Sequence, residues 1–304
     1  MIGEIQLTFN DSTINRTNDI ELLSDAIRAR GLTPTVVRSH QMHMHMHNDI
    51  PYALINLSAF PNETHLRYVR HMELSGSKII NPILPTMYST DKFLSNLELK
   101  HININVPKTL NLLTAYRNVG TTAYIKDQIG FPCVLKYPTS AFGVGVHLIK
   151  DEKEFEDIYD ILTVSATRYG DFSTTSNFMV QEFIPETLGK DIRVLVLNGK
   201  CIGAMLRVNP IGWSVKRVQW SPDRPETHAD IIYSEYNIDS ELSDTCIRIC
   251  DKLNLSFAGL DVLFGKDSYI YGEVNPFPGL SNFNKMNPKA DLPGQLVDIL
   301  INRE

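Results

Sequence analysis

The stretch "GLDVLFGKDSYIYGEVNPFPG", residues 259–279, predicts a β-hairpin that carries acidic side chains. Two runs of alternating apolar residues flank "GKDS", which is the pattern of antiparallel strands joined by a short turn. With the turn near Asp267, Asp261 lies directly across from Glu273. Glu273 and Asn275 share one face, because strand side chains alternate. The opposite face is expected to be filled by Val262, Phe264, Ile270 and Val274.

Two carboxylates placed across a strand pair repel each other unless a positive charge lies between them. Asp261, Glu273 and Asn275 present oxygen atoms, which Mg²⁺ prefers as ligands. A solvated strand face could also carry the two acids. The amide of Asn275 and the following Pro-Phe-Pro-Gly turn, which fixes the strand end, favour a magnesium site instead.

A phosphate site would complete such a metal site, because Mg²⁺ held by few protein oxygens takes its other ligands from water and phosphate. The stretch "VLKYPTSAFGVGVHLIK", residues 134–150, places Lys136 at a strand end before a loop with Gly143 and Gly145. Glycines let backbone amides approach phosphate oxygens, and the lysine adds a positive charge. The loop matches neither the P-loop pattern nor the dinucleotide fingerprint. Taken alone, it is also compatible with an ordinary hairpin.

The composition is that of a globular intracellular protein. Of 304 residues, 43% are hydrophobic and the formal net charge is −6, which gives no electrostatic reason to expect nucleic acid or an anionic membrane as partner. The N-terminus lacks the pattern of a secretory signal, and no apolar run is long enough to span a bilayer. Four cysteines without CxxC spacing are typical of a reduced, cytoplasmic protein.

Strand and helix patterns divide the chain into three parts. Residues 1–88 alternate strand-like and helical stretches, which predicts an N-terminal α/β domain with a mainly parallel sheet. Residues 89–183 begin with a helix that Ser89, Thr90 or Asp91 can cap, and continue as a smaller α+β section. Residues 184–304 are rich in strands and contain the acidic hairpin. The overall fold class is therefore α/β and α+β.

Histidine and methionine alternate in residues 42–47, which follow His40 and Gln41. In an extended chain His43, His45 and His47 would share a face and could ligate zinc or nickel. The alternative is a connection after a strand, with solvated histidines and methionines packed beneath them. The alternative is favoured, because the sequence shows no supporting shell for a metal.

The order of these motifs resembles that of a known superfamily. A strand lysine, a Gly-x-Gly loop, "VQEFI", "KDIR" and a D…E-x-N hairpin follow one another between Asn81 and Asn284. This arrangement resembles the ATP-grasp superfamily, and most closely its RimK-like carboxylate–amine ligases. The resemblance implies an ATP-grasp fold preceded by a Rossmann-like domain, in which two subdomains hold ATP between their sheets.

The resemblance also implies roles for particular residues. The phosphates would be contacted by Lys136, by a flap from Thr139 to Gly145 and by a helix lysine. The strand-end acid and the hinge would contact adenine. The acid of "KDIR" would hold the ribose. The nucleotide-binding set implied is Lys92, Lys136, Gly143, Gly145, Glu182, Phe183, Ile184 and Asp191. The metal ligands implied are Asp261, Glu273 and Asn275, with Glu273 bridging two Mg²⁺, for which Mn²⁺ is an alternative. Arg193 and Arg207 match the basic, catalytic positions near the transferred phosphoryl group.

The implied activity is ATP-dependent ligation of a carboxylate and an amine through an acyl phosphate, with release of ADP and phosphate. The substrates would be an amino acid, a peptide or a peptide-like carboxylate, and homo-oligomerisation stays open. One departure concerns an Arg-Ser-Asn tripeptide of the closest relatives, which aligns here with Ser214, Val215 and Lys216. The identity of the acceptor is therefore open. A non-catalytic ATP-binding regulatory protein is the alternative. Trp213 and Trp220 are compatible with either a core or a pocket wall.

Overall fold

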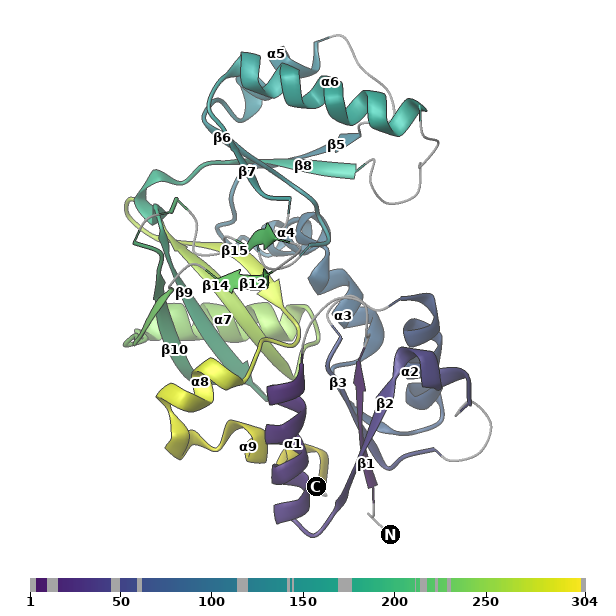
Figure 1. Cartoon of the computed structure of the whole chain (residues 1–304). Coiled ribbons are helices and arrows are strands. Elements are labelled where there is room, and N and C mark those ends of the chain that lie inside the picture. The colour runs from purple at the N-terminus through teal and green to yellow at the C-terminus, as the bar shows by residue number, and fades with distance from the viewer. Residues whose placement is uncertain are drawn as a thin grey trace.

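The computed structural model describes most of the chain and consists of three sheets with their covering helices and one short two-stranded sheet (Figure 1). The described residues are 4–9, 16–44, 50–58, 62–113, 120–140, 143, 145–168, 177–210, 212–213, 218–221, 224–228 and 231–301.

The N-terminal sheet is parallel, as predicted, with strand order β2-β1-β3-β4. Its strands are β1 (Glu4–Phe9), β2 (Thr33–Arg38), β3 (Ala53–Asn56) and β4 (Lys78–Ile80). The helices α1 (Thr17–Ala29) and α2 (Glu63–Leu74) connect them, and Asn62 caps α2 by accepting from the His65 amide at 2.8 Å. The short helix η1 (Ser39–Met44) follows β2 and buries Met42, which agrees with the non-metal interpretation of this part of the His–Met tract.

The sequence reasoning missed one helix. Helix α3 (Ile83–Thr90) precedes α4 (Lys92–His101), so Ser89 and Thr90 lie inside α3. Asp91 alone caps α4, where its carboxylate accepts from the amides of Phe93 and Leu94 at 2.9 and 3.0 Å. The hydroxyls of Ser89 and Thr90 instead donate to carbonyls one turn earlier in α3.

A small antiparallel sheet with strand order β5-β8-β6-β7 forms the upper part of Figure 1 and carries two helices on its outer face. Its elements are β5 (Thr109–Leu113), α5 (Thr121–Gln128), β6 (Cys133–Lys136), β7 (His147–Ile149), α6 (Glu152–Arg168) and β8 (Asn177–Glu182). Phe155, Leu135, Ile149 and Val180 lie in a hydrophobic core whose members all come from this part of the chain.

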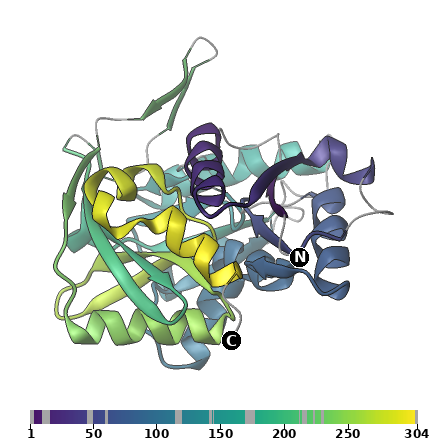
Figure 2. The same cartoon turned by 90° about the horizontal axis from the view of Figure 1, so that it is seen from below.

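A five-stranded antiparallel sheet with strand order β13-β10-β9-β14-β15 forms the centre of the molecule. Its strands are β9 (Lys190–Leu197), β10 (Lys200–Val208), β13 (Ile232–Glu235), β14 (Phe257–Phe264) and β15 (Tyr269–Asn275). Helix α7 (Ser240–Lys252) covers one face with Leu242, Cys246, Ile249 and Cys250, which are spaced as one helical stripe. The strands β11 (Val218–Ser221) and β12 (Arg224–His228) pair with each other, and Figure 2 shows them projecting from the rest.

The predicted hairpin is β14–β15, and Asp261 is paired with Glu273 as expected. A β-bulge next to this pair shifts the register, so that Val262 pairs with Tyr271. The bulge corrects the expectation for Ile270. Tyr271 and Tyr269, rather than Ile270, pack with Val262 and Val274 in the core beneath α7.

One hydrophobic core joins the N-terminal sheet to the C-terminal part of the chain. It contains Ile5, Leu7 and Ile55 from the first sheet together with Phe257 and Leu296 from the end of the chain. The remaining elements are η2 (Pro185–Thr187), between β8 and β9, and α8 (Ser281–Met286), η3 (Pro288–Ala290) and α9 (Leu292–Ile301) at the C-terminal side. Figure 2 shows α8 and α9 close to α1, and Arg30 binds Asp298 of α9 with its Nη2 at 2.7 Å from Oδ2.

Candidate active site

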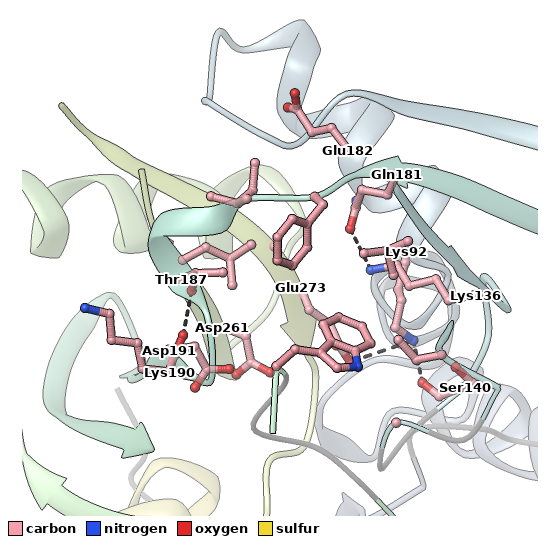
Figure 3. A pocket seen from close by; sticks show the side chains of 18 residues that line it. Lys92, Lys136, Ser140, Gln181, Glu182, Thr187, Lys190, Asp191, Asp261 and Glu273 are labelled. Atoms are coloured by element: carbon pink, nitrogen blue, oxygen red, sulfur yellow. Dashed lines mark hydrogen bonds and ion pairs between the residues drawn. The ribbon is translucent and has the colours of Figure 1, made fainter. Parts of the chain in front are cut away.

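A cleft opens between the small sheet and the five-stranded sheet, and it contains most of the predicted site residues (Figure 3). The space between its lining side chains is about 870 Å³ with the open mouth included. The predicted residues that line it are Lys92, Lys136, Gly143, Glu182, Phe183, Ile184, Asp191, Asp261 and Glu273. Side chains from two sheets and one helix therefore meet at one place.

Lys136 ends β6 and is 9% exposed. Its Nζ donates to Oε1 of Gln181 on the neighbouring strand at 2.8 Å (Figure 3). Gln181 in turn donates to the hydroxyl of Thr109 at 3.0 Å. This chain of hydrogen bonds fixes the direction of the lysine while leaving its charge in the cleft. Sequence reasoning did not single out Gln181, although its place beside the strand-end Glu182 was visible.

The two flap glycines adopt the left-handed conformation, with φ of +74° at Gly143 and +69° at Gly145. A Cβ atom on Gly145 would lie 2.4 Å from the ring of Tyr137, so both the backbone angle and the close approach require glycine there. Tyr137 stacks on Phe178 with ring centroids 4.3 Å apart. The flap is therefore anchored on the small sheet. Ala141, Phe142 and Val144 of the predicted flap lie outside the described residues.

Lys92, the first residue of α4, connects the base of the flap to the acidic hairpin. It is 4% exposed, and its Nζ donates to the carbonyl oxygen of Ser140 and lies 3.5 Å from that of Pro138. The same Nζ lies 3.8 Å from a carboxylate oxygen of Glu273. Burial of an ammonium group requires such partners. Lys92 thus places a positive charge between the flap and Glu273.

Four charged side chains form a buried chain across β10, β9 and β14. Arg207 binds Asp191 through two hydrogen bonds of 2.6 Å each, and its Nη2 also lies 2.9 Å from Asp261. Arg193 binds both oxygens of Asp261, with its Nη2 at 2.8 Å from Oδ2. Arg207 is directly opposite Asp191 in the strand register, and Arg193 is directly opposite Asp261. The predicted ribose ligand, metal ligand and catalytic arginines are therefore one connected network.

The network keeps Arg207 charged despite its burial. Burial lowers the pKa of the Arg207 guanidinium, but the neighbouring charges of Asp261 and Asp191 and their hydrogen bonds raise it further, so the net shift is upward. A permanently charged guanidinium at this depth is suited to binding a phosphate or acyl phosphate.

The oxygen donors of the hairpin fit a magnesium ion. Asp261 and Glu273 both line the cleft, and Asn275 follows on the same face with its amide 3.4 Å from the Gly259 carbonyl. Two carboxylates and one amide are hard oxygen ligands, and this number leaves positions for phosphate and water. Within the described ranges, no group of three His, Cys, Asp or Glu forms an alternative metal site. His45 and His47 lie outside those ranges.

The strand-end residues form the other end of the cleft. The Glu182 carboxylate accepts from the Lys108 amide at 2.7 Å, so it ties β8 to the segment before β5. Phe183 and Ile184 supply apolar surface, and Phe183 meets Trp213 edge-to-face with ring centroids 6.2 Å apart. The sequence left Trp213 undecided between core and pocket wall, and the structure places it in the lining of the cleft.

Residues of the N-terminal domain hold the turn that follows the acidic hairpin. The side chain of Asn81, which is 1% exposed, binds the Phe257 amide at 3.0 Å, the Phe257 carbonyl at 2.6 Å and the Pro276 carbonyl. Arg16 donates to the Phe277 carbonyl at 3.0 Å, and Asp19 accepts from the Leu280 amide at 3.0 Å. The ends of β14 and β15 are thus fixed from outside the sheet.

Comparison with known proteins identifies the family of this chain. A model of the RimK-like ATP-grasp domain matches residues 89–300. The chain belongs to the RimK-like ATP-grasp family. A probable alpha-L-glutamate ligase of Maridesulfovibrio salexigens is 29% identical over 236 residues, which cover 76% of this chain and 70% of that protein. The coenzyme gamma-F420-2:alpha-L-glutamate ligase of Methanocaldococcus jannaschii is 28% identical over 229 residues, covering 74% and 71%.

Solved structures agree on the fold. The ATP-grasp ligase PsnB complexed with minimal precursor aligns with a TM-score of 0.71 at 18% identity, covering 98% of this chain and 99% of that chain. The D-alanine–D-alanine ligase of Bacillus anthracis aligns with a TM-score of 0.71 at 14% identity, covering 98% and 96%. The ATP-grasp fold predicted from the sequence is confirmed, and so is the reaction class, ATP-dependent carboxylate–amine ligation. Across the described ranges, no helix is both long and apolar enough to cross a membrane.

Proposed function

We propose that this RimK-like ligase joins the amino group of an amino acid to a carboxyl group of a peptide or peptide-like acceptor. The observation that carries the proposal is the convergence of Lys92, Lys136, Asp261 and Glu273 in one cleft between two sheets. Glutamate is the first amine to test, because the similar proteins named above are glutamate ligases. The cleft residues fit the nucleotide, and the names of the relatives point to the substrates.

The proposed reaction has two steps. A carboxylate oxygen of the acceptor attacks the γ-phosphorus of ATP, and ADP leaves with the electron pair of the broken P–O bond. The amine nitrogen then attacks the acyl carbon, phosphate leaves, and the amine loses a proton. Lys136 and Lys92 would bind phosphate oxygens, and the Arg193–Arg207 pair would stabilise the negative charge of the acyl phosphate.

Asp261, Glu273 and Asn275 would hold Mg²⁺, which supplies charge neutralisation at the phosphates when it is bound. We propose two ions, with Glu273 shared between them and Mn²⁺ able to replace Mg²⁺. The remaining assignments are adenine contacts by the hinge residues Glu182, Phe183 and Ile184, a ribose contact by Asp191, and closure of the flap glycines over the phosphates. A cytoplasmic location is also proposed, because all four cysteines, each in the described part of the chain, are free thiols.

The experiment measures ADP release with MgATP, glutamate and a panel of peptide carboxylates. A productive pair is expected to give ADP in equal amount to an acceptor that has gained the mass of one amino acid residue. Addition of hydroxylamine in place of the amine should convert the acyl phosphate into a hydroxamate. ADP binding without ADP release for any acid–amine pair would favour the non-catalytic regulatory alternative.

A further inference from the structure

Asn209, Gly212 and Trp213 follow β10, and Trp213 lines the cleft. None of the sequence motifs includes this segment. Gly189, before β9, donates its amide to the Trp213 carbonyl at 3.0 Å, and the Asn209 amide donates to the Gly189 carbonyl at 2.7 Å. Gly212 donates its amide to the Asn209 side chain at 3.1 Å. These bonds fix the backbone of residue 213 against the loop that follows the hinge.

Gly189 makes this close approach possible. Its φ is +68°, and a Cβ atom there would lie 2.6 Å from the Gly212 carbonyl oxygen and 2.8 Å from that of Asn209. Both contacts are with backbone atoms, which cannot move aside as a side chain can. The sequence therefore provides a glycine at the position where the Trp213 segment has to come near the hinge.

The indole of Trp213 lies in the cleft beside the hinge. It lines the cleft together with Phe183, Ile184 and Asp191, and its ring meets Phe183 edge-to-face. Edge-to-face packing uses the edge of one ring and leaves aromatic surface available to a ligand. Lys92, Lys136 and Glu273 supply the charged part of the same cleft. The aromatic pair thus offers apolar surface to a ligand, which suits a nucleoside rather than a triphosphate.

We propose that Trp213 contacts the nucleoside of bound ATP and, with Phe183, forms an aromatic wall of its subsite. Trp213 sets the affinity for the adenine nucleoside independently of the phosphates. This inference rests on the proposed binding of ATP in this cleft. It adds a residue outside the predicted hinge, flap, ribose and metal contacts.

Intrinsic fluorescence tests the contact directly, because the chain contains only two tryptophans. Trp220 lies on β11 in the projecting two-stranded sheet (Figure 2) and gives a matched control. In the Trp220→Phe variant, saturating adenosine should change the emission of Trp213. In the Trp213→Phe variant, adenosine should cause no change. A change that persists in Trp213→Phe and disappears in Trp220→Phe would overturn the proposal.

Calorimetric titration of Trp213→Ala measures the effect on affinity. The Kd should rise about tenfold, equivalent to about 1.4 kcal/mol, for adenosine and for ADP alike, because the lost contact is with the shared nucleoside. Trp213→Leu, which keeps apolar bulk, replaces this variant if it does not fold. Unchanged affinity, or weaker binding of ADP with normal binding of adenosine, contradicts the proposal.

The two proposals fail in different ways. A wild-type protein that binds adenosine and ADP with Trp213 involved, yet ligates no acid–amine pair, would remove the proposed function and support the role of Trp213. A wild-type protein that ligates normally while Trp213→Ala binds adenosine as tightly would remove the role of Trp213 alone. A wild-type protein that binds no adenine nucleotide would overturn both.

Discussion

Residues 109–182 have a hydrophobic core of their own, whereas the N-terminal and C-terminal parts of the chain share one. Near the cleft, the small sheet makes polar contacts with the remainder, such as those of Lys92 with the carbonyls of Pro138 and Ser140. The shared core is reinforced by buried hydrogen bonds of Asn81 and by the Arg30–Asp298 pair. Polar contacts at a surface separate at lower cost than a common core.

This difference in cores predicts which side of the cleft is the more mobile. The five-stranded sheet, with Asp261 and Glu273, belongs to the larger body, and the flap with Lys136 belongs to the smaller one. Opening of the cleft to admit a nucleotide is expected to move the flap and Lys136 as one unit. Helix α4 packs through Leu99 into the core of the five-stranded sheet, so Lys92 stays with the larger body. The predicted division at residues 88 and 183 remains a prediction.

The largest effect on turnover is expected for Glu273→Gln, a substitution in the five-stranded sheet of the larger body. Loss of the negative charge removes a proposed metal ligand while the volume is kept, so ADP formation should fall about a thousandfold or more, on the order expected for several kcal/mol of lost charge stabilisation. The free energy of unfolding should change by less than about 2 kcal/mol. Steady-state ADP release and denaturant unfolding measure the two quantities. Unchanged turnover at saturating Mg²⁺ would refute the metal assignment.

Asn81→Leu should weaken the attachment of the N-terminal sheet to the strands β14 and β15. The substitution keeps the approximate volume but leaves a buried backbone amide and two carbonyls without their partner, which should cost about 3 kcal/mol or more. Urea unfolding measures the loss. Asn105→Leu is the control, because Asn105 also bonds a backbone carbonyl, that of Tyr269, but is exposed. A cost for Asn81→Leu no greater than for the control would contradict the proposed role.

A fall in pH should lower the free energy of unfolding through the protonation of His65. Burial lowers the pKa of the fully buried His65 imidazole to about 4, below the value near 6.5 of an unfolded chain. The unfolded state therefore binds the extra proton between these values, and stability is lost as the pH falls from about 6.5 to about 4, by about 3 kcal/mol at most. His65→Gln, which can still donate to Asn56, should show a shallower pH dependence of unfolding. His101→Gln, at an exposed histidine, should not.

The smallest effect is expected for a substitution in the flap, which belongs to the smaller body. Gly145→Ala and Gly130→Ala both place alanine at a positive φ, which should cost each variant about 1 kcal/mol. Only at position 145 does the new methyl group meet a neighbour, the ring of Tyr137. Gly145→Ala should therefore lower turnover more than Gly130→Ala, with the free energy of unfolding as reference. Equal turnover in the two variants would argue against an active role of the flap.

The sequence predicted those parts of the site that depend on local pattern. Strand alternation and turn residues were enough to pair Asp261 with Glu273 and to place Lys136 at a strand end. The bulge that displaces Ile270 was not predictable, because an extra residue changes no local preference that can be read from alternation. The contacts of Asp261 with two arginines and the position of Trp213 depend on which strands become neighbours, and that information lies in packing distant in sequence.

Arg16 and Asp19 bind the turn after β15, and each lies 261 residues before its partner in the sequence. During synthesis these two residues precede their partners by that same distance. Helix α9, which pairs with Arg30, follows those partners in the chain. Contacts so far apart close slowly and late in folding. The turn after the acidic hairpin is therefore expected to be secured late, after the strands β14 and β15 have paired with each other.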